Sequence, residues 1–293
     1  MRSISLISAI TLIIIMSSCT EEIKVNLGSI TPELVVDGAI TTDTMVHTIY
    51  LTKTANYFSN VAPQGISGAL VTINDGVRTI TLTEDPVVQG AYHTPSTYFG
   101  VPGRTYTLTI DSVDVNGDGI KERYTASCIL NAVPPIKSIA VEKEQLFSNN
   151  VWAVEIWMHD PGNVSNYYLM RLYRNNVCVT DTINQWGVIS DAYFNGQNLN
   201  GQTVMYFSSK HAGETLENGD LVTLQLCGIT KDYITFINEV DAAYKGSNPL
   251  FGGQSSNIST NIVQQFPANA SGSPQGFFAA YATTYGSTVY KSN

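Results

Sequence analysis

Short runs of strand-forming residues, separated by turn residues, repeat along almost the whole chain and constrain its fold more than any other feature. Ser, Thr, Tyr, Val and Ile dominate the runs, and Gly, Asn, Asp and Pro interrupt them. The run 47–52 alternates with a period of two residues, as a half-buried strand does. Before residue 134, about seven such runs follow one another at spacings of about ten to fifteen residues, which is typical of a β-sandwich. We therefore expect a mainly β protein whose first domain, residues 33–133, is a small β-sandwich.

Pro134-Pro135 interrupts this pattern near the middle of the chain. Proline has no N–H to donate to a sheet, so two consecutive prolines predict a domain boundary here. A second β-rich domain, residues 136–290, is expected to follow. It contains one sequence with helical spacing of apolar residues, 231–244, and ends in a strand from about residue 276. The segment 248–274 is rich in Asn, Ser, Gly and Pro and is predicted to form long loops.

The first residues have the features of an export signal. Arg2 is followed by an apolar stretch, residues 4–16, which is too short to cross a bilayer as a stable helix. Met16-Ser17-Ser18-Cys19 resembles a lipobox, in which the cysteine is acylated and becomes the first residue of the mature chain. We expect residues 1–18 to be a lipoprotein signal peptide, Cys19 to be lipidated and residues 19–32 to be a tether. The alternative is an ordinary secretory signal with a chance cysteine.

The composition restricts the class of partner. The formal net charge is −9, and the sequence has no basic cluster, which argues against nucleic-acid binding. Charged residues make up 13% of the chain and hydrophobic residues 43%, as expected of a folded protein. No second apolar run reaches membrane-spanning length.

Three cysteines remain besides Cys19: Cys128, Cys178 and Cys227. Because three is an odd number, at least one is a free thiol or pairs with another chain. Cys178 with Cys227 is the one pair considered for a disulfide. The alternative is that all three are small buried side chains in strands.

The loop sequence Asp114-Val115-Asn116-Gly117-Asp118-Gly119 resembles the start of a calcium-binding loop. Oxygen atoms of Asp114, Asn116 and Asp118 would converge on a hard cation, and a glycine at the sixth position permits the turn. The bidentate Glu expected at the twelfth position is absent, since Thr125 stands there. The alternative is a plain β-hairpin loop, for which Asn-Gly and Asp-Gly are favoured.

Evidence for catalysis is weak in the sequence. It has no GxSxG, HExxH or phosphate-binding P-loop motif. The four histidines are scattered, and His159-Asp160 are neighbours whose side chains point to opposite faces of a strand. Aromatic pairs recur at Tyr57-Phe58, Tyr98-Phe99, Tyr193-Phe194 and Tyr206-Phe207. Exposed members would suit sugar or peptide binding or docking, whereas the alternative places one member of each pair in the core.

Several segments together resemble one family. They include the opening strand 34–40, the strand 68–73, the run Gly103-Arg104-Thr105-Tyr106, the segment Asp160-Pro161 followed by Asn166-Tyr167-Tyr168, and the closing strand 276–281. In this order they resemble the domain-of-unknown-function 4249 lipoproteins of Bacteroidota, over nearly all of the mature chain. The first half is also similar to Ig-like and carboxypeptidase-regulatory-like β-sandwiches. The resemblance implies an outer-membrane lipoprotein associated with a TonB-dependent transporter, and it implies no particular ligand.

Two classes of function remain open on this evidence. The first is a non-enzymatic accessory or ligand-binding lipoprotein, anchored through Cys19 and exposed at the cell surface, with a TonB-dependent outer-membrane transporter as its partner. The second is an envelope hydrolase on a β-sandwich scaffold whose acidic residues come from loops. A purely structural envelope protein is a third alternative. We expect no cofactor other than calcium.

Overall fold

The computed structural model describes residues 31–55, 62–146, 149–245, 258–267 and 272–292. Residues 1–18, Cys19 and all but the last two residues of the tether 19–32 lie outside this part of the chain, as does Tyr57-Phe58. The described residues form three β-sheets and one α-helix, which confirms the mainly β prediction. None of the described helices is long and apolar enough to cross a membrane.

The strands of the first half largely follow the runs seen in the sequence. They are β1 (Leu34–Thr41), β2 (Thr48–Lys53), β3 (Leu70–Asn74), β4 (Thr79–Thr81), β5 (Thr83–Glu84), β6 (Ala91–His93), β7 (Thr105–Val113) and β8 (Glu122–Ile129). The alternating burial of β7 and β8 shows that each has one face in the core, as their period-two patterns predict.

The second half contains the remaining strands and the helix. The strands are β9 (Ile136–Leu146), β10 (Asn149–His159), β11 (Tyr167–Arg174), β12 (Val177–Cys178), β13 (Gly187–Ser190), β14 (Asn198–Ser208), β15 (Leu221–Ile229), β16 (Ile262–Phe266) and β17 (Gln275–Val289). Short 3-10 turns, η1 (Ile183–Gln185) and η2 (Asp191–Tyr193), flank β13. The helix α2 (Lys231–Lys245) lies where the sequence predicts it.

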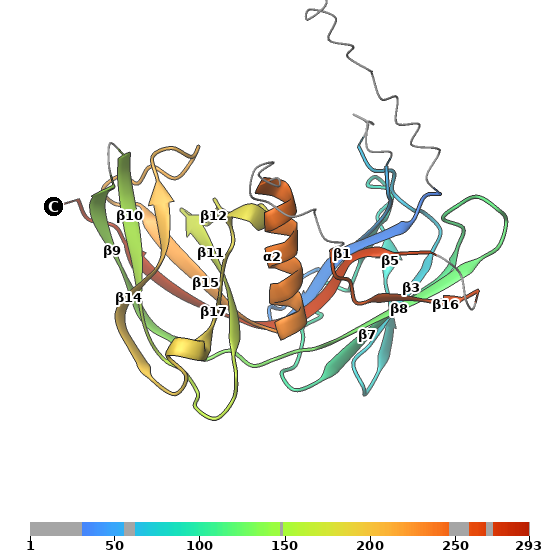
Figure 1. Ribbon diagram of the computed structural model, residues 1–293, viewed down its shortest axis with the longest axis horizontal. Helices are drawn as coiled ribbons and strands as arrows, with labels where there is room; N and C mark the ends of the chain where they lie inside the picture. The colour runs from blue at the N-terminus through green and yellow to red at the C-terminus, as the bar shows by residue number, and fades with distance from the viewer. Residues whose placement is uncertain (1–30, 56–61, 147–148, 246–257, 268–271, 293) are drawn as a thin grey trace, which may run out of the picture. The chain divides into compact units, whose positions relative to one another are not determined.

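The largest sheet has nine strands and runs through both halves of the chain. Its order is β12-β11-β15-β17-β1-β2-β6-β5, with β13 also paired to β11. The long strand β17 makes the connection, because residues 275–281 pair in parallel with β1 and residues 282–289 pair antiparallel with β15 (Figure 1). The other two sheets have the orders β16-β8-β7-β3-β4 and β14-β10-β9.

This topology differs from the expected pair of β domains, 33–133 and 136–290, joined at Pro134-Pro135. A single sheet crosses that boundary, and β16 pairs with β8 of the first half. The segment 262–266 is therefore a strand in a region predicted to be loop. Pro134-Pro135 does interrupt the local strand pattern, but local pattern cannot report that a strand more than a hundred residues later pairs with β1.

Three hydrophobic cores fill the spaces between these sheets. The first half buries side chains that include Val36, Leu108 and Phe278 between the large sheet and the five-stranded sheet. The second half buries a separate set, including Phe207 and Leu224, between the large sheet and β14-β10-β9. The two halves thus have their own cores but share strand β17.

The third core lies under helix α2. Tyr233, Ile234 and Ile237 of the helix pack on the opposite face of the large sheet, against residues that include Phe277 and Tyr281. The hydroxyl oxygen of Thr230 accepts a hydrogen bond from the Tyr233 N–H at 3.2 Å, which stabilises the start of the helix. The helical spacing of its apolar residues therefore predicted both the helix and the face that it buries.

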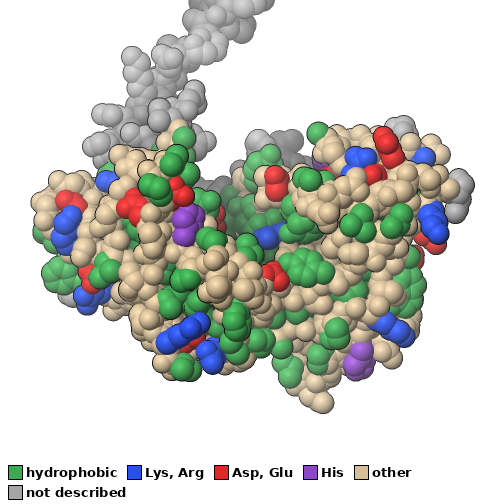
Figure 2. Space-filling view, turned by 180° about the vertical axis from the view of Figure 1, so that it is seen from behind, with side chains coloured by type: hydrophobic (Ala, Val, Ile, Leu, Met, Phe, Trp, Pro, Cys, Tyr) green, Lys and Arg blue, Asp and Glu red, His purple; other side chains and the backbone are tan. Residues whose placement is uncertain are grey.

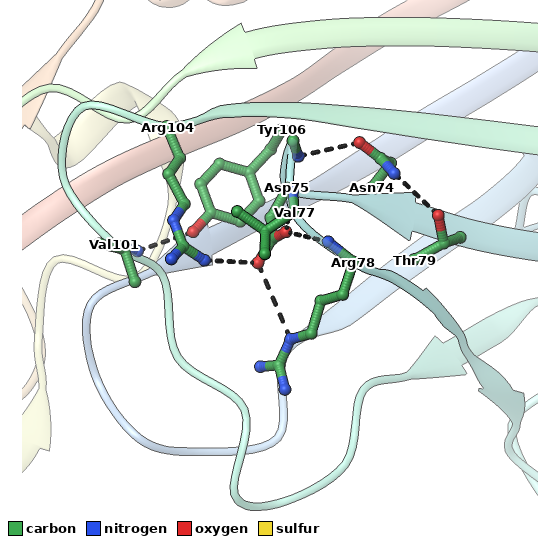
Figure 3. Close-up of polar contacts among 9 residues, drawn as sticks. Asn74, Asp75, Val77, Arg78, Thr79, Val101, Arg104 and Tyr106 are labelled. Atoms are coloured by element: carbon green, nitrogen blue, oxygen red, sulfur yellow. Dashed lines mark hydrogen bonds and ion pairs between the residues drawn. The ribbon is translucent and has the colours of Figure 1, made fainter.

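A polar cluster surrounds Asp75 in the β3–β4 turn of the first half (Figure 3). The buried Asp75 carboxylate accepts hydrogen bonds from the N–H groups of Val77 and Arg78, at 2.9 and 2.8 Å. Arg104 donates to its other oxygen at 2.8 Å. Burial raises the pKa of Asp75, but these hydrogen bonds and the Arg104 charge outweigh it, so the net pKa lies below the ordinary 3.8. Gly76, with φ of +84°, permits the tight turn.

The three described cysteines are free thiols. Cys128 and Cys227 are buried and Cys178 is half-buried, so the Cys178–Cys227 disulfide considered from the sequence is not formed. The structure matches the alternative, in which cysteine serves as a small side chain within strands.

Candidate functional site

A cavity of about 520 Å³ opens in the second half, between strands β13 and β14. In the described part of the chain, β13 pairs only with β11 and β14 pairs only with β10. The two strands are thus the edges of two facing sheets, and the sandwich is open between them. Binding pockets commonly measure about 300 to 1,000 Å³. The cavity is therefore large enough to take a small ligand.

The floor of this pocket is apolar because inward-facing residues of neighbouring strands meet there. It includes Met158 of β10, Tyr168 and Met170 of β11, and Leu226 of β15, all of which belong to the second core. Alternate residues along each strand share a face, so these positions bring their side chains to the same interior. The floor is thus the part of the core that the open edge leaves uncovered.

The rim of the pocket is made of uncharged polar side chains from the first half of β14. Asn198, Asn200 and Gln202 are exposed and lie at alternate positions, with Gln197 just before the strand. Each carboxamide offers both hydrogen-bond donors and acceptors. The described lining contains no Asp, Glu, His, Lys, Arg or Cys. This arrangement can bind and orient an uncharged polar ligand.

Two buried carboxylates hold the loop between β13 and β14. Asp160 is fully buried and accepts hydrogen bonds from the Tyr168 hydroxyl, at 2.5 Å, and from the Gly196 N–H, at 3.0 Å. Asp191 accepts a hydrogen bond from the Asn166 N–H at 2.8 Å. Burial and the Asp160 charge raise the pKa of Tyr168, so its hydroxyl keeps the proton that it donates. These contacts fix the loop that carries Tyr193.

The aromatic pair Tyr193-Phe194 divides between this loop and the core. Phe194 stacks on Tyr168 with ring centres 6.3 Å apart, whereas 92% of Tyr193 is exposed at the pocket. Phe207 is fully buried while its neighbour Tyr206 is exposed, as the core alternative predicted for that pair. Tyr98 is likewise buried beside an exposed Phe99. Among the described pairs, Tyr193 is the aromatic side chain that is both exposed and beside the cavity.

A second cavity, of about 680 Å³, adjoins the first along β14. The two share lining residues at Met158 and 198–200, and the second also includes Trp157, Lys137 and both residues of Pro134-Pro135. His159 lines it and is exposed, while the adjacent Asp160 points into the protein, as expected for neighbours on a strand. The start of β14 thus lies between two hollows of the surface.

Strand β14 is irregular beside these cavities. Its pairing with β10 shifts register twice, between Val154 and Glu155 and between Ile156 and Trp157. Gly201 has φ of +82°, and a Cβ atom there would lie 2.9 Å from the Trp157 ring. Glycine is therefore required both by the backbone conformation and by the close contact with Trp157.

Arg171 lies on the other face of the large sheet, beside α2, and packs against Trp186. The guanidinium of Arg171 is 4.1 Å from the centre of the Trp186 ring. Arg171 Nε and Trp186 Nε1 are buried and have no hydrogen-bond partner among the described residues. Burial raises the pKa of Asp37, and the Arg171 charge opposes this effect. The described carboxylates lie outside ion-pair distance of Arg171, so its main described partner is the Trp186 ring.

The loop predicted to bind calcium is an exposed hairpin connection between β7 and β8. Both carboxylate oxygens of Asp114 accept hydrogen bonds from the loop itself, from the N–H groups of Gly117 and Gly119. Asp118 accepts from the Ile120 N–H and from the side-chain amide of Asn116, at 2.7 and 2.9 Å. Among the described residues, no group of three or more His, Cys, Asp or Glu is placed to hold a metal. Calcium binding stays a prediction.

The pocket residues were largely missed by reading the sequence. The sequence analysis assigned no role to Asn198, Asn200 or Gln202, which strand β14 places at alternate exposed positions. Tyr193 was a candidate from its aromatic pair alone. The signal that could have revealed the site is the spacing of Asn198, Asn200 and Gln202, with polar side chains at every second position.

Comparison with known proteins gives the family and no characterised relative. A search of curated proteins found no match to the chain. The model of the family described as domain of unknown function 4249 (DUF4249) matches residues 20–286. The match covers nearly all of the sequence beyond the predicted signal, including every residue of the pocket. The chain therefore belongs to the DUF4249 family.

Proposed function

We propose that this chain is a non-enzymatic binding protein of the cell envelope, with its ligand site in the pocket between β13 and β14. The observation that carries the proposal is the combination of an apolar floor, an amide rim and the exposed Tyr193 around one cavity. Catalysis of hydrolysis needs an acid, base, nucleophile or metal at the reacting atoms. The described lining offers amide, hydroxyl and apolar groups, which suit recognition.

The proposed place of the protein is the outer membrane, anchored through the lipidated Cys19 and exposed at the cell surface. The support is the sequence around the anchor: a short apolar stretch, two serines and then the cysteine, followed by Glu21 and Glu22. An acidic polar tether would keep the folded domain away from the membrane surface. The proposed partner is a TonB-dependent outer-membrane transporter, to which a tethered binding protein would deliver ligand.

Replacement of Cys19 tests the anchor. Because the thiol is the only proposed attachment point of the lipid, Cys19→Ala should move the protein from the membrane fraction to the soluble fraction and abolish metabolic acyl labelling. Cys178→Ala is the matched control and should leave both unchanged, since Cys178 is half-buried in the folded domain. Membrane association and labelling that persist in Cys19→Ala would contradict the lipoprotein proposal.

Two further measurements test the partner and the absence of catalysis. Affinity purification of the tagged chain from native membranes should enrich a TonB-dependent transporter, with Cys19→Ala as the unanchored comparison. Incubation of the purified chain with panels of glycans and peptides should give no turnover. Turnover abolished by one point substitution would instead support the envelope-hydrolase alternative, and purification without any transporter would contradict the proposed partnership.

A further inference from the structure

The chemistry of the pocket selects among the ligands that a neutral site can bind. Its floor is apolar and its rim consists of carboxamides, so a matching ligand needs an apolar face bordered by uncharged polar groups. A sugar ring has this character, with C–H groups on its faces and hydroxyl groups at its edge. We infer that the pocket between β13 and β14 binds an uncharged oligosaccharide. This inference rests on the proposed binding function and names its ligand class.

Tyr193 provides the surface on which a sugar ring would stack. Its side chain is 92% exposed although it borders the cavity, so the ring is available to a ligand. The loop beneath it is held by Asp160 and Asp191 through hydrogen bonds to backbone N–H groups. Because the loop is already ordered, little conformational entropy is lost when a ligand stacks on Tyr193. A tyrosine ring also has few rotatable bonds, which reduces that loss further.

The amides of β14 match sugar hydroxyl groups in hydrogen-bonding character and in charge. The carboxamides of Asn200 and Gln202 each carry a donor and an acceptor at the rim, and a sugar hydroxyl can use both, whereas the Asn198 oxygen already lies 3.1 Å from the His159 ring nitrogen Nδ1. A charged ligand would have to leave water without a counter-charge among the described lining residues, which is costly. The pocket between β13 and β14 therefore favours uncharged saccharide units over acidic ones, while Lys137 and His159 border only the second cavity.

The second cavity indicates that the ligand is longer than a single sugar. It shares residues 198–200 with the pocket and includes Trp157, a second aromatic side chain. An oligosaccharide seated against Tyr193 can continue over the start of β14 to the Trp157 side. The two aromatic side chains then contact different units of one chain, with the amide row between them.

A peptide added as an extra strand is the main competing occupant, since β13 and β14 are both sheet edges. Their geometry does not favour it. Strand β13 has four residues, and β14 is interrupted by two register shifts and by Gly201 in the left-handed conformation. Short and bulged edges are features that prevent strand addition in natural sheets. The described edges thus favour a ligand held by side chains over one held by backbone pairing.

Glycan-array binding and calorimetry with the purified full-length chain test the inference. We expect binding to one or more uncharged oligosaccharides, and at least tenfold weaker binding by Tyr193→Ala. Tyr206→Ala is the matched control, because Tyr206 is an exposed tyrosine of β14 that does not line the pocket. Equal melting temperatures of the variants and the parent chain would show that the loss is not a loss of folding.

A second variant tests the length of the ligand. Trp157→Phe retains an aromatic ring but removes the outer indole ring, which both reduces the stacking surface and loosens packing against Gly201, so its melting temperature is compared with that of the parent chain. It should weaken binding of long oligosaccharides several-fold and leave the shortest bound ligand unaffected. Equal affinities for short and long chains in the parent protein would overturn the extension over β14.

Three outcomes would overturn the saccharide inference. They are no binding to any saccharide on the array, binding to acidic saccharides alone, and saccharide binding that Tyr193→Ala leaves unchanged. A peptide or other small molecule whose binding depends on Tyr193 would also overturn it, while leaving the proposed binding function intact. Only the failure of every ligand class to bind at the pocket would contradict both the saccharide inference and the proposed binding function.

Discussion

The two halves of the molecule are both sandwich-like and share strand β17, but they differ at their edges. In the first half, β1, β2 and the adjoining part of β17 pack against the five-stranded sheet, and the chain passes from β4 at the edge of that sheet directly to β5 at the edge of the large sheet. The Asp75–Arg104 cluster holds the β3–β4 turn (Figure 3). In the second half, β13 and β14 remain separate edges, and both described cavities lie beside β14. A sandwich that is left open between two edges exposes part of its core, and this exposed part is the candidate site.

The pocket also differs from the surrounding surface in the kinds of side chain that line it. Figure 2 shows hydrophobic, acidic and basic side chains interspersed over one face of the molecule. The pocket of the second half instead brings together apolar and amide side chains without charges in its described lining. The comparison suggests where a candidate site arises in a sandwich: it lies where two facing sheet edges are left unpaired, so that part of the core is exposed.

The largest expected effect concerns whether the two halves unfold together. Leu108 is fully buried in the first core, and Leu108→Ala should cost about 2 to 5 kcal/mol of unfolding free energy. All three tryptophans, Trp152, Trp157 and Trp186, lie in the second half, so their fluorescence reports that half alone. Because β17 contributes to the first core and pairs with β15 of the second half, we expect the fluorescence transition in urea to shift as far as the circular-dichroism transition.

Leu224→Ala, at a fully buried position of the second core, is the matched control for this measurement. It should also shift both transitions together. A fluorescence transition that stays in place when Leu108 is replaced would show that the halves unfold independently, and that the shared strand does not couple them.

The next effect concerns the loop of the open half. Asp160→Asn can still accept from the Gly196 N–H, but its NH₂ group then faces the Tyr168 hydroxyl, whose own proton is left without an acceptor. An unmatched buried polar group costs about 1 to 3 kcal/mol, which urea unfolding can measure. Hydrogen exchange should increase in residues 191–198 and not around Asp75. Asp181→Asn, at an exposed position, is the control, and unchanged exchange in the loop would contradict the role given to Asp160.

A smaller effect, dependent on pH, is expected in the first half. The folded-state pKa of Asp75 lies below 3.8, so its contribution to stability is fully present above pH 3.8 and is lost as the pH falls through the lower, folded value. Asp75→Asn should cost about 1 kcal/mol at pH 7 because the bonds to Arg104 and the turn weaken. The difference from the parent chain should shrink on acidification below pH 3.8. A difference that is constant with pH would show that the charge of Asp75 is not responsible.

The smallest effect concerns the 114–119 loop of the first half. Its own N–H groups already occupy the carboxylate oxygens of Asp114, so we expect equal melting temperatures with calcium and with a chelator. If Asp114, Asn116 and Asp118 do bind calcium, free calcium at a hundred times the dissociation constant would stabilise the folded state by about 2.7 kcal/mol. That would raise the melting temperature by several degrees, and Asp118→Ala would remove the increase. Such a shift would replace the hairpin interpretation by a calcium site.

The positions of most strands and of the helix followed from the sequence. Helix α2 lies within a residue of its expected bounds, because its apolar spacing is regular. The pairing of β17 did not follow. Residues 277–282 are buried on both faces, and such a continuous apolar run shows that a strand is central without identifying its neighbours.

The sequence by itself determined the mainly β class, the helix and the family membership suggested by its motifs, and it predicts an anchor at Cys19. These properties depend on residues close together in the chain, where the spacing of side chains directly reflects local conformation. Tertiary structure alone decided that one sheet crosses Pro134-Pro135 and that the β14 amides meet Tyr193 and the floor of the second core. Both arrangements come from contacts between distant segments, whose free energies depend on burial and pairing that no local pattern encodes.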